Sequence, residues 1–190
     1  MSIQLKLSQG LAFLMLTGAL LSSGAEAATF NFTSTLSGSQ ENPAVPTLAT
    51  GSATATLVGD FGASNWVFTY SGSYSDLTTN RTVNHIHNAP AGTNGPVVFD
   101  LTNGTITGTT SGIFTGDWTF AEGLTDTFAT SLINNGMYFN IHSTTYAGGE
   151  IRGQILVSEP IPEPSGVLAT LFLAGSGVCL KLRRKSSASA

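Results

Sequence analysis

Apolar and polar residues alternate with a period of two through the middle of the chain. Successive side chains of a β-strand point to opposite faces of the sheet, so this spacing predicts strands that each bury one face. Four runs carry the pattern most clearly: Phe30–Phe32, Ala53–Leu57, Trp66–Tyr70 and Ile151–Val157.

Clusters of Gly, Asn, Asp and Pro separate these runs and predict turns between about eight short strands. They fall at 59–62, 88–92, 94–96, 103–104 and 148–149. Many short strands with frequent turns are typical of an all-β fold, so we expect an antiparallel β-sandwich or Greek-key barrel, immunoglobulin-like or superoxide-dismutase-like. One short helix is expected over Asp126–Asn134, where Phe128 and Leu132 lie four residues apart.

The first residues have the three parts of a secretory signal peptide. Lys6 supplies a positive start, Leu11–Leu21 is an apolar run, and Ala25-Glu26-Ala27 forms an A-x-A cleavage site. We therefore expect residues 1–27 to be removed by signal peptidase and the remainder to be exported.

The last 32 residues, 159–190, form a second three-part segment. The parts are Pro162-Glu163-Pro164, an apolar stretch over 166–182, and a basic cluster of Arg183, Arg184 and Lys185. A spanning helix needs about 20 apolar residues, so the stretch is near the lower limit for a transmembrane segment. The basic cluster would keep the C-terminal side of that segment in the cytoplasm.

This order of parts resembles the PEP-CTERM sorting signals of Gram-negative bacteria. The resemblance implies recognition by an exosortase-type enzyme and at least transient anchoring in the inner membrane. Localisation in the cell envelope, at the cell surface or in the extracellular matrix would follow.

The charge distribution excludes one class of partner. Of 7 basic residues, Arg81 and Arg152 alone lie between Thr29 and Glu163, against ten acidic residues, which gives this region a net charge of −8. Binding to phosphate backbones requires clustered Lys and Arg, so nucleic acid is not expected as a partner.

Several phrases of residues 28–158 resemble the CHRD domain, an extracellular module first recognised in the animal protein chordin. They are Leu36-Ser37-Gly38-Ser39-Gln40-Glu41-Asn42-Pro43, Asn84-His85-Ile86-His87-Asn88-Ala89-Pro90-Ala91, Tyr138-Phe139-Asn140-Ile141-His142-Ser143 and Gly148-Gly149-Glu150-Ile151-Arg152-Gly153-Gln154. The resemblance names a module whose role in bacteria is undefined, so it implies an exported domain without naming its activity.

All three histidines lie within these phrases. His85 and His87 are two apart on a predicted strand and project from one face, and His142 lies on another strand. If the two strands are neighbours, three imidazoles converge as a Zn²⁺ or Cu²⁺ site requires, with nitrogens within about 4 Å of one another. The alternative is a structural role, in which the histidines hydrogen-bond Asn84, Asn140 and Glu150 at a corner of the sheet.

Arg152 is expected to form an ion pair that fixes the last strand. Glu150, two residues earlier on the same face, is the first candidate partner, and Glu41 is another. A bidentate contact between guanidinium and carboxylate suits such a role.

The pattern as a whole favours a non-enzymatic envelope or matrix protein with a structural or binding role, whose partners include exopolysaccharide or other envelope components. The alternative is a metal-binding domain, redox-active in the manner of superoxide dismutase, although three histidines are too few for the dinuclear site of that enzyme. No nucleophile elbow, P-loop or EF-hand pattern occurs.

Overall fold

The computed structural model describes residues 27–158. This part of the chain contains ten strands, one α-helix and three short 3₁₀ helices. In chain order they are β1 (Ala28–Ser37), η1 (Gly38–Gln40), β2 (Thr50–Gly59), β3 (Val67–Ser75), β4 (Arg81–Asn88), β5 (Val97–Asp100), η2 (Leu101–Asn103), β6 (Thr105–Ile106), β7 (Gly112–Thr119), η3 (Phe120–Glu122), α1 (Asp126–Ile133), β8 (Met137–Ser143), β9 (Ile151–Gln154) and β10 (Leu156–Val157).

The predicted signal peptide and sorting tail lie outside the described residues, apart from Ala27. Their cleavage site, PEP motif, apolar stretch and basic cluster therefore remain predictions. Within 27–158, no helix has the length and apolar character needed to cross a bilayer.

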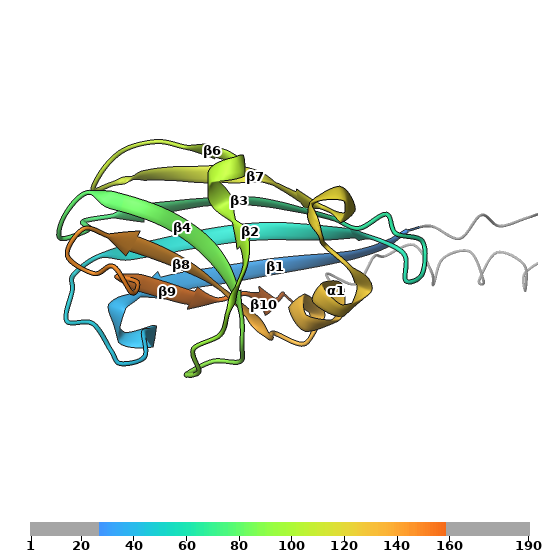
Figure 1. Cartoon of the computed structure of the whole chain (residues 1–190), viewed down its shortest axis with the longest axis horizontal. Helices are drawn as coiled ribbons and strands as arrows, with labels where there is room; N and C mark the ends of the chain where they lie inside the picture. Colours follow the sequence, from blue (N-terminus) through green and yellow to red (C-terminus); the bar gives the residue numbers. More distant parts are fainter. Residues whose placement is uncertain (1–26, 159–190) are drawn as a thin grey trace, which may run out of the picture.

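All strands belong to one antiparallel sheet, in the order β5-β4-β8-β9-β1-β2-β3-β7-β6, with β10 paired to β1. The sheet curls around its own inner face (Figure 1). The all-β antiparallel prediction is confirmed. A sandwich of two sheets and a Greek-key barrel were both expected, and the strands form a single curled sheet. Because β9 pairs with β1 through Ser37 and Arg152, the two halves stay joined in one continuous half-barrel.

The inner face of the curl holds the hydrophobic core. Aromatic rings from distant strands meet there, with Phe68 and Phe139 at 6.4 Å between centroids and Phe114 and Phe139 at 5.6 Å. Large buried rings provide most of the apolar area that stabilises a fold of this size. The period-two runs of the sequence therefore correspond to alternate inward and outward positions.

The predicted helix forms as α1, from Asp126 to Ile133. Asp126 accepts hydrogen bonds from the indole Nε1 of Trp66, at 2.7 Å, and from the backbone N–H of Gly62, at 3.0 Å. An acidic residue in the first turn also interacts favourably with the helix dipole. These contacts fix the helix against the turn between β2 and β3.

Strand β8 positions the candidate site because both of its faces are buried. Met137, Phe139 and Ile141 belong to the hydrophobic core. The alternate residues, Tyr138 and His142 among them, are also buried but point to the opposite, polar side of the sheet. Beneath the loops that follow β4 and β8, this side carries the candidate functional residues.

Candidate metal centre

Strands β4 and β8 are neighbours, as a three-histidine site requires. Their antiparallel register places His87 opposite Tyr138 and His85 opposite Asn140. Residues that face each other across a ladder share a side of the sheet, and His142 shares that side because it lies two residues beyond Asn140. The fold therefore brings together all three histidines that the sequence singled out.

The imidazole nitrogens converge to within metal-binding range of one another. Nδ1 of His85 lies 3.3 Å from Nε2 of His142, and one ring nitrogen from each histidine lies within 4.8 Å of the others. Two nitrogens bound tetrahedrally to Zn²⁺ at 2.0–2.1 Å would be about 3.3 Å apart. The first pair matches this spacing, while the full set is wider than the expected limit of about 4 Å and would have to contract around an ion.

The second nitrogen of two rings fixes which atoms face the centre. Nδ1 of His87 lies 2.9 Å from the carbonyl oxygen of Gly95, and Nδ1 of His142 lies 2.9 Å from that of Ala147. A carbonyl oxygen only accepts hydrogen bonds, so both Nδ1 atoms carry the proton and both Nε2 atoms present a lone pair. Metal-binding histidines usually have this outer hydrogen bond to a carbonyl or carboxylate.

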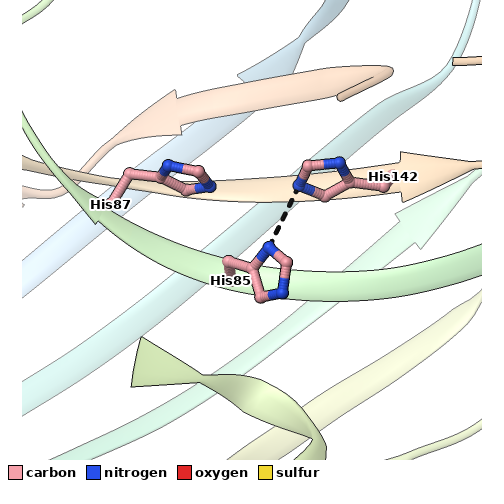
Figure 2. Close-up of side chains that lie close together, drawn as sticks. All are labelled: His85, His87 and His142. Atoms are coloured by element: carbon pink, nitrogen blue, oxygen red, sulfur yellow. Dashed lines mark hydrogen bonds between the residues drawn. The ribbon is translucent and has the colours of Figure 1, made fainter. Parts of the chain in front are cut away.

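Figure 2 shows the rings of His87 and His142 directed toward each other, with His85 to one side of the space between them. His142 Nε2 is already engaged as the acceptor for His85 Nδ1–H. Nε2 of His87, by contrast, is buried without a hydrogen-bond partner among residues 27–158. A buried polar atom with no partner costs about 1–3 kcal/mol, which marks this nitrogen as the unusual atom of the cluster.

Burial keeps two of the three imidazoles uncharged. Desolvation lowers the pKa of His87 and of His142 below the usual 6.5, and nearby positive charge, including that of Arg152, lowers both further. The hydrogen bonds to Gly95 and Ala147 act in the opposite direction but do not outweigh burial. Neutral imidazole is the form that binds a metal ion, so the site favours the ligating state at neutral pH.

The donor set of the described chain consists of these three side chains. His85 is less buried than His87 and His142, so the cluster is most exposed at His85. Asp100 faces His85 from β5, but its carboxylate accepts two hydrogen bonds from Thr102. Three protein ligands with a fourth position left for water or another ligand describe an open rather than a closed metal site.

The expected hydrogen bonds to Asn84, Asn140 and Glu150 do not occur. The histidines instead hold backbone carbonyls of two loops, so a structural role of a different kind is also built into the geometry. The two roles are compatible, because the same Nδ1 bonds orient the rings for ligation.

The predicted ion pair between Glu150 and Arg152 is wrong, and Glu41 is the partner. The guanidinium of Arg152 contacts Oε2 of Glu41 through NH2 at 2.9 Å and through Nε at 3.1 Å. Glu150 precedes β9 and its Oε1 accepts three hydrogen bonds, from the side chain of Thr47 and from the backbone and side chain of Thr78. Oε1 of Glu150 is therefore held by the segments between β1 and β2 and between β3 and β4.

Tyr138 is the residue of this region that sequence reasoning missed. Its ring stacks on His87 with centroids 4.9 Å apart and planes 9° apart, and the Arg152 guanidinium carbon lies 4.1 Å from its centroid. The available signal was its position: it shares a strand face with His142 and precedes it by four residues.

The CHRD domain family model matches residues 32–155. The chain belongs to the CHRD domain family. The match includes all three histidines, Glu41 and Arg152, so the candidate site is made within the family domain itself. The searches of curated proteins and of solved structures found no match.

Proposed function

We propose that this CHRD domain binds one divalent transition-metal ion, Zn²⁺ or Cu²⁺, through His85, His87 and His142. The observation that carries the proposal is Nε2 of His87, a buried lone pair with no partner, directed at two other imidazoles whose nitrogens lie within 4.8 Å. An ion at this point would satisfy that atom and would replace the contact between His85 and His142.

The ligand type restricts the ion. Imidazole nitrogen suits Zn²⁺ and Cu²⁺, whereas Mg²⁺ and Ca²⁺ prefer oxygen ligands that the cluster does not supply. The nearest acidic side chain across the ladder from His85 is Asp100, and it is held by Thr102. We therefore expect strong preference for Zn²⁺ or Cu²⁺ over the alkaline-earth ions.

Calorimetric titration of the metal-free protein with Zn²⁺ at pH 7.5 tests the proposal. We expect one ion per chain and a higher melting temperature, since an ion at 100 times its dissociation constant stabilises the folded state by about 2.7 kcal/mol. The substitution His87→Ala should abolish both effects, while Asp117→Asn on the outer face should change neither. Absence of stoichiometric binding by the parent protein would eliminate the metal role and leave the structural role of the histidines.

We also propose that the protein acts outside the cytoplasm as a non-enzymatic binding component of the cell envelope, sorted through its C-terminal tail. The sequence of both termini and the acidic character of the domain support this role. In the described chain, β1 begins at Ala28, and Ser158 bonds Asn31 of the same strand, so both ends of the domain leave from one end of the sheet (Figure 1). This arrangement suits attachment through a single tail.

Cell fractionation tests the sorting proposal. Removal of residues 161–190 should release the domain into the periplasm or the medium, because the predicted signal peptide is retained and the predicted anchor is lost. The full-length chain, expressed in parallel, should remain with the membrane fraction until its tail is processed. A truncated chain that still co-sediments firmly with membranes would contradict the anchoring role.

A further inference from the structure

We propose that Tyr138 is a positioning residue for the candidate metal centre. Its ring stacks on His87 and fixes the ring plane and the tautomer of that histidine, while Arg152 supports the other face of the Tyr138 ring. The inference rests on the proposed metal binding but concerns a residue outside the ligand set. It assigns a role to the stack of three side chains, Arg152, Tyr138 and His87.

The stack follows from the strand order. Strand β8 lies between β4 and β9, so His87 of β4 and Arg152 of β9 approach the Tyr138 ring from its two sides. His87 is nearly parallel to the ring, at 9° and 4.9 Å, and the guanidinium carbon of Arg152 is 4.1 Å from the ring centroid. Tyr138 is 1% exposed and Arg152 is 4% exposed, so these contacts occur out of solvent.

Gly95 links the Tyr138 hydroxyl to the His87 imidazole through two hydrogen bonds. The backbone N–H of Gly95 donates to this hydroxyl at 3.2 Å, and the carbonyl of the same residue accepts the Nδ1 proton of His87 at 2.9 Å. One residue therefore joins the phenol and the imidazole that stack on each other. A side chain at position 95 would collide with the backbone carbonyl of Asn88, so glycine allows this close approach.

Arg152 holds the loop that carries Gly95. It donates from NH1 to the carbonyl of Thr93 at 3.1 Å and from NH2 to Oδ1 of Asn94 at 2.6 Å. These are the two residues that precede Gly95. The same guanidinium thus supports the Tyr138 ring directly and fixes the backbone that accepts the His87 proton.

The consequence for His87 is a restricted choice of ring states. A free neutral imidazole can carry its proton on either nitrogen, and only one tautomer leaves Nε2 available to the centre. The stack prevents rotation of the ring, and the Gly95 carbonyl selects the Nδ1–H form. Loss of such outer contacts typically lowers metal affinity by about 10–100-fold.

The experiment compares Tyr138→Leu with Tyr138→Phe in the purified protein, with Zn²⁺ as the probe. The leucine variant loses the stack, and we expect its Zn²⁺ affinity to fall about 10–100-fold. The phenylalanine variant keeps the ring and should restore most of that affinity. Tyr74→Leu is the matched control, because Tyr74 is another buried tyrosine, on β3, that bonds carbonyls of Thr107 and Gly108 and touches none of the histidines.

A second measurement is independent of metal. Nitrogen-15 NMR of the metal-free protein should show His87 in the single Nδ1–H tautomer in the parent and in Tyr138→Phe, and a mixture of tautomers in Tyr138→Leu. If Tyr138→Leu does not fold, Tyr138→Met replaces it, because methionine also fills the volume without a planar ring.

The outcomes separate the two proposals. A parent protein that binds no Zn²⁺ refutes the proposed function, and the tautomer of His87 then still decides whether Tyr138 positions the ring. A parent that binds Zn²⁺, with Tyr138→Leu binding as tightly as Tyr74→Leu and with an unchanged His87 tautomer, overturns the positioning role alone.

Discussion

Replacement of Arg152 by lysine should destabilise the domain strongly, although it conserves the charge. The Arg152 and Glu41 side chains are only 5% and 4% exposed, so the ion pair between them is shielded from water. The guanidinium satisfies three different acceptors: Glu41, the Thr93 carbonyl and the Asn94 side chain. A lysine ammonium is a single point donor and cannot reach three acceptors arranged around a planar fork.

The magnitude follows from the acceptors that lose their donor. If lysine keeps its contact with Glu41, the Thr93 carbonyl and the Asn94 side chain lose their donor. Both residues are exposed, so water can replace the donor, and each lost hydrogen bond costs about 0.5–1.5 kcal/mol. With the charge retained, we expect a loss of about 1–3 kcal/mol in the free energy of unfolding. Arg152→Met, which leaves Glu41 charged and buried without a partner, should cost about 3–5 kcal/mol.

Urea denaturation followed by tryptophan fluorescence measures these losses. With a slope of about 2 kcal/mol per molar urea, the lysine effect corresponds to a midpoint shift of about 0.5–1.5 M. Arg81→Lys is the control, since the Arg81 side chain is only partly buried and bonds the carbonyl of the next residue at 3.3 Å. If Arg152→Lys unfolds within about 0.5 kcal/mol of Arg81→Lys, the buried pair is not a stabilising feature.

Two further predictions concern other parts of the domain. The pKa values of His87 and His142 lie below 6.5, so the unfolded chain binds protons before the folded chain on acidification. The stability of the metal-free protein should therefore be full above about pH 6.5 and should fall below it. Replacing both histidines by Phe should flatten this dependence in urea midpoints measured from pH 7.5 to 5.5. Substitution of Asp126 by Ala should lower the free energy of unfolding by about 1.5–3 kcal/mol, because the Trp66 indole loses a charged acceptor. Asp117→Ala, on the exposed face, should cost less than about 1 kcal/mol. Equal melting temperatures for the two variants would contradict the role of Asp126.

The sequence predicted most of the elements because their patterns are local, although it predicted about eight strands where residues 27–158 contain ten. Alternation identified the strands, and Phe128 and Leu132 identified the helix, since each pattern reports which side chains face the core. It left open whether the strands form one sheet, because a two-sheet sandwich and a single-sheet Greek-key barrel were both expected. The junction depends on pairing between β1 and β9, at Ser37 and Arg152, which lie more than a hundred residues apart and carry no local signal.

The histidine cluster was predictable because face parity follows from spacing. His85 and His87 must share a face of any regular strand. To place His142 beside them required one further assumption, that β4 and β8 are neighbours. The carbonyls that fix the tautomers were not predictable. Every residue has a carbonyl group, so nothing in the sequence marks those of Gly95 and Ala147 as the acceptors.

The ion pair shows where proximity in sequence misleads. Glu150 and Arg152 share a face in a regular strand, yet Glu150 lies before β9 begins, and its carboxylate turns to Thr47 and Thr78. Glu41 reaches Arg152 because η1 follows β1, which runs beside β9. The ion pair between Glu41 and Arg152 is thus a consequence of the strand order in the sheet. The same strand order joins the two halves of the sheet.

Stability and the proposed metal binding should therefore be coupled in this domain. Arg152 contributes to the buried pair with Glu41 and also contacts the ring that orients His87, so one substitution acts on both. Residues that share a partner usually show interaction energies of about 0.5–3 kcal/mol. A double-mutant cycle of Arg152→Lys with Tyr138→Leu should consequently be non-additive in Zn²⁺ affinity, because the second substitution removes a ring that the first has already left unsupported. Additive losses would mean that Arg152 and Tyr138 act on the site independently, through the loop at Thr93 and Asn94 in the one case and through His87 in the other.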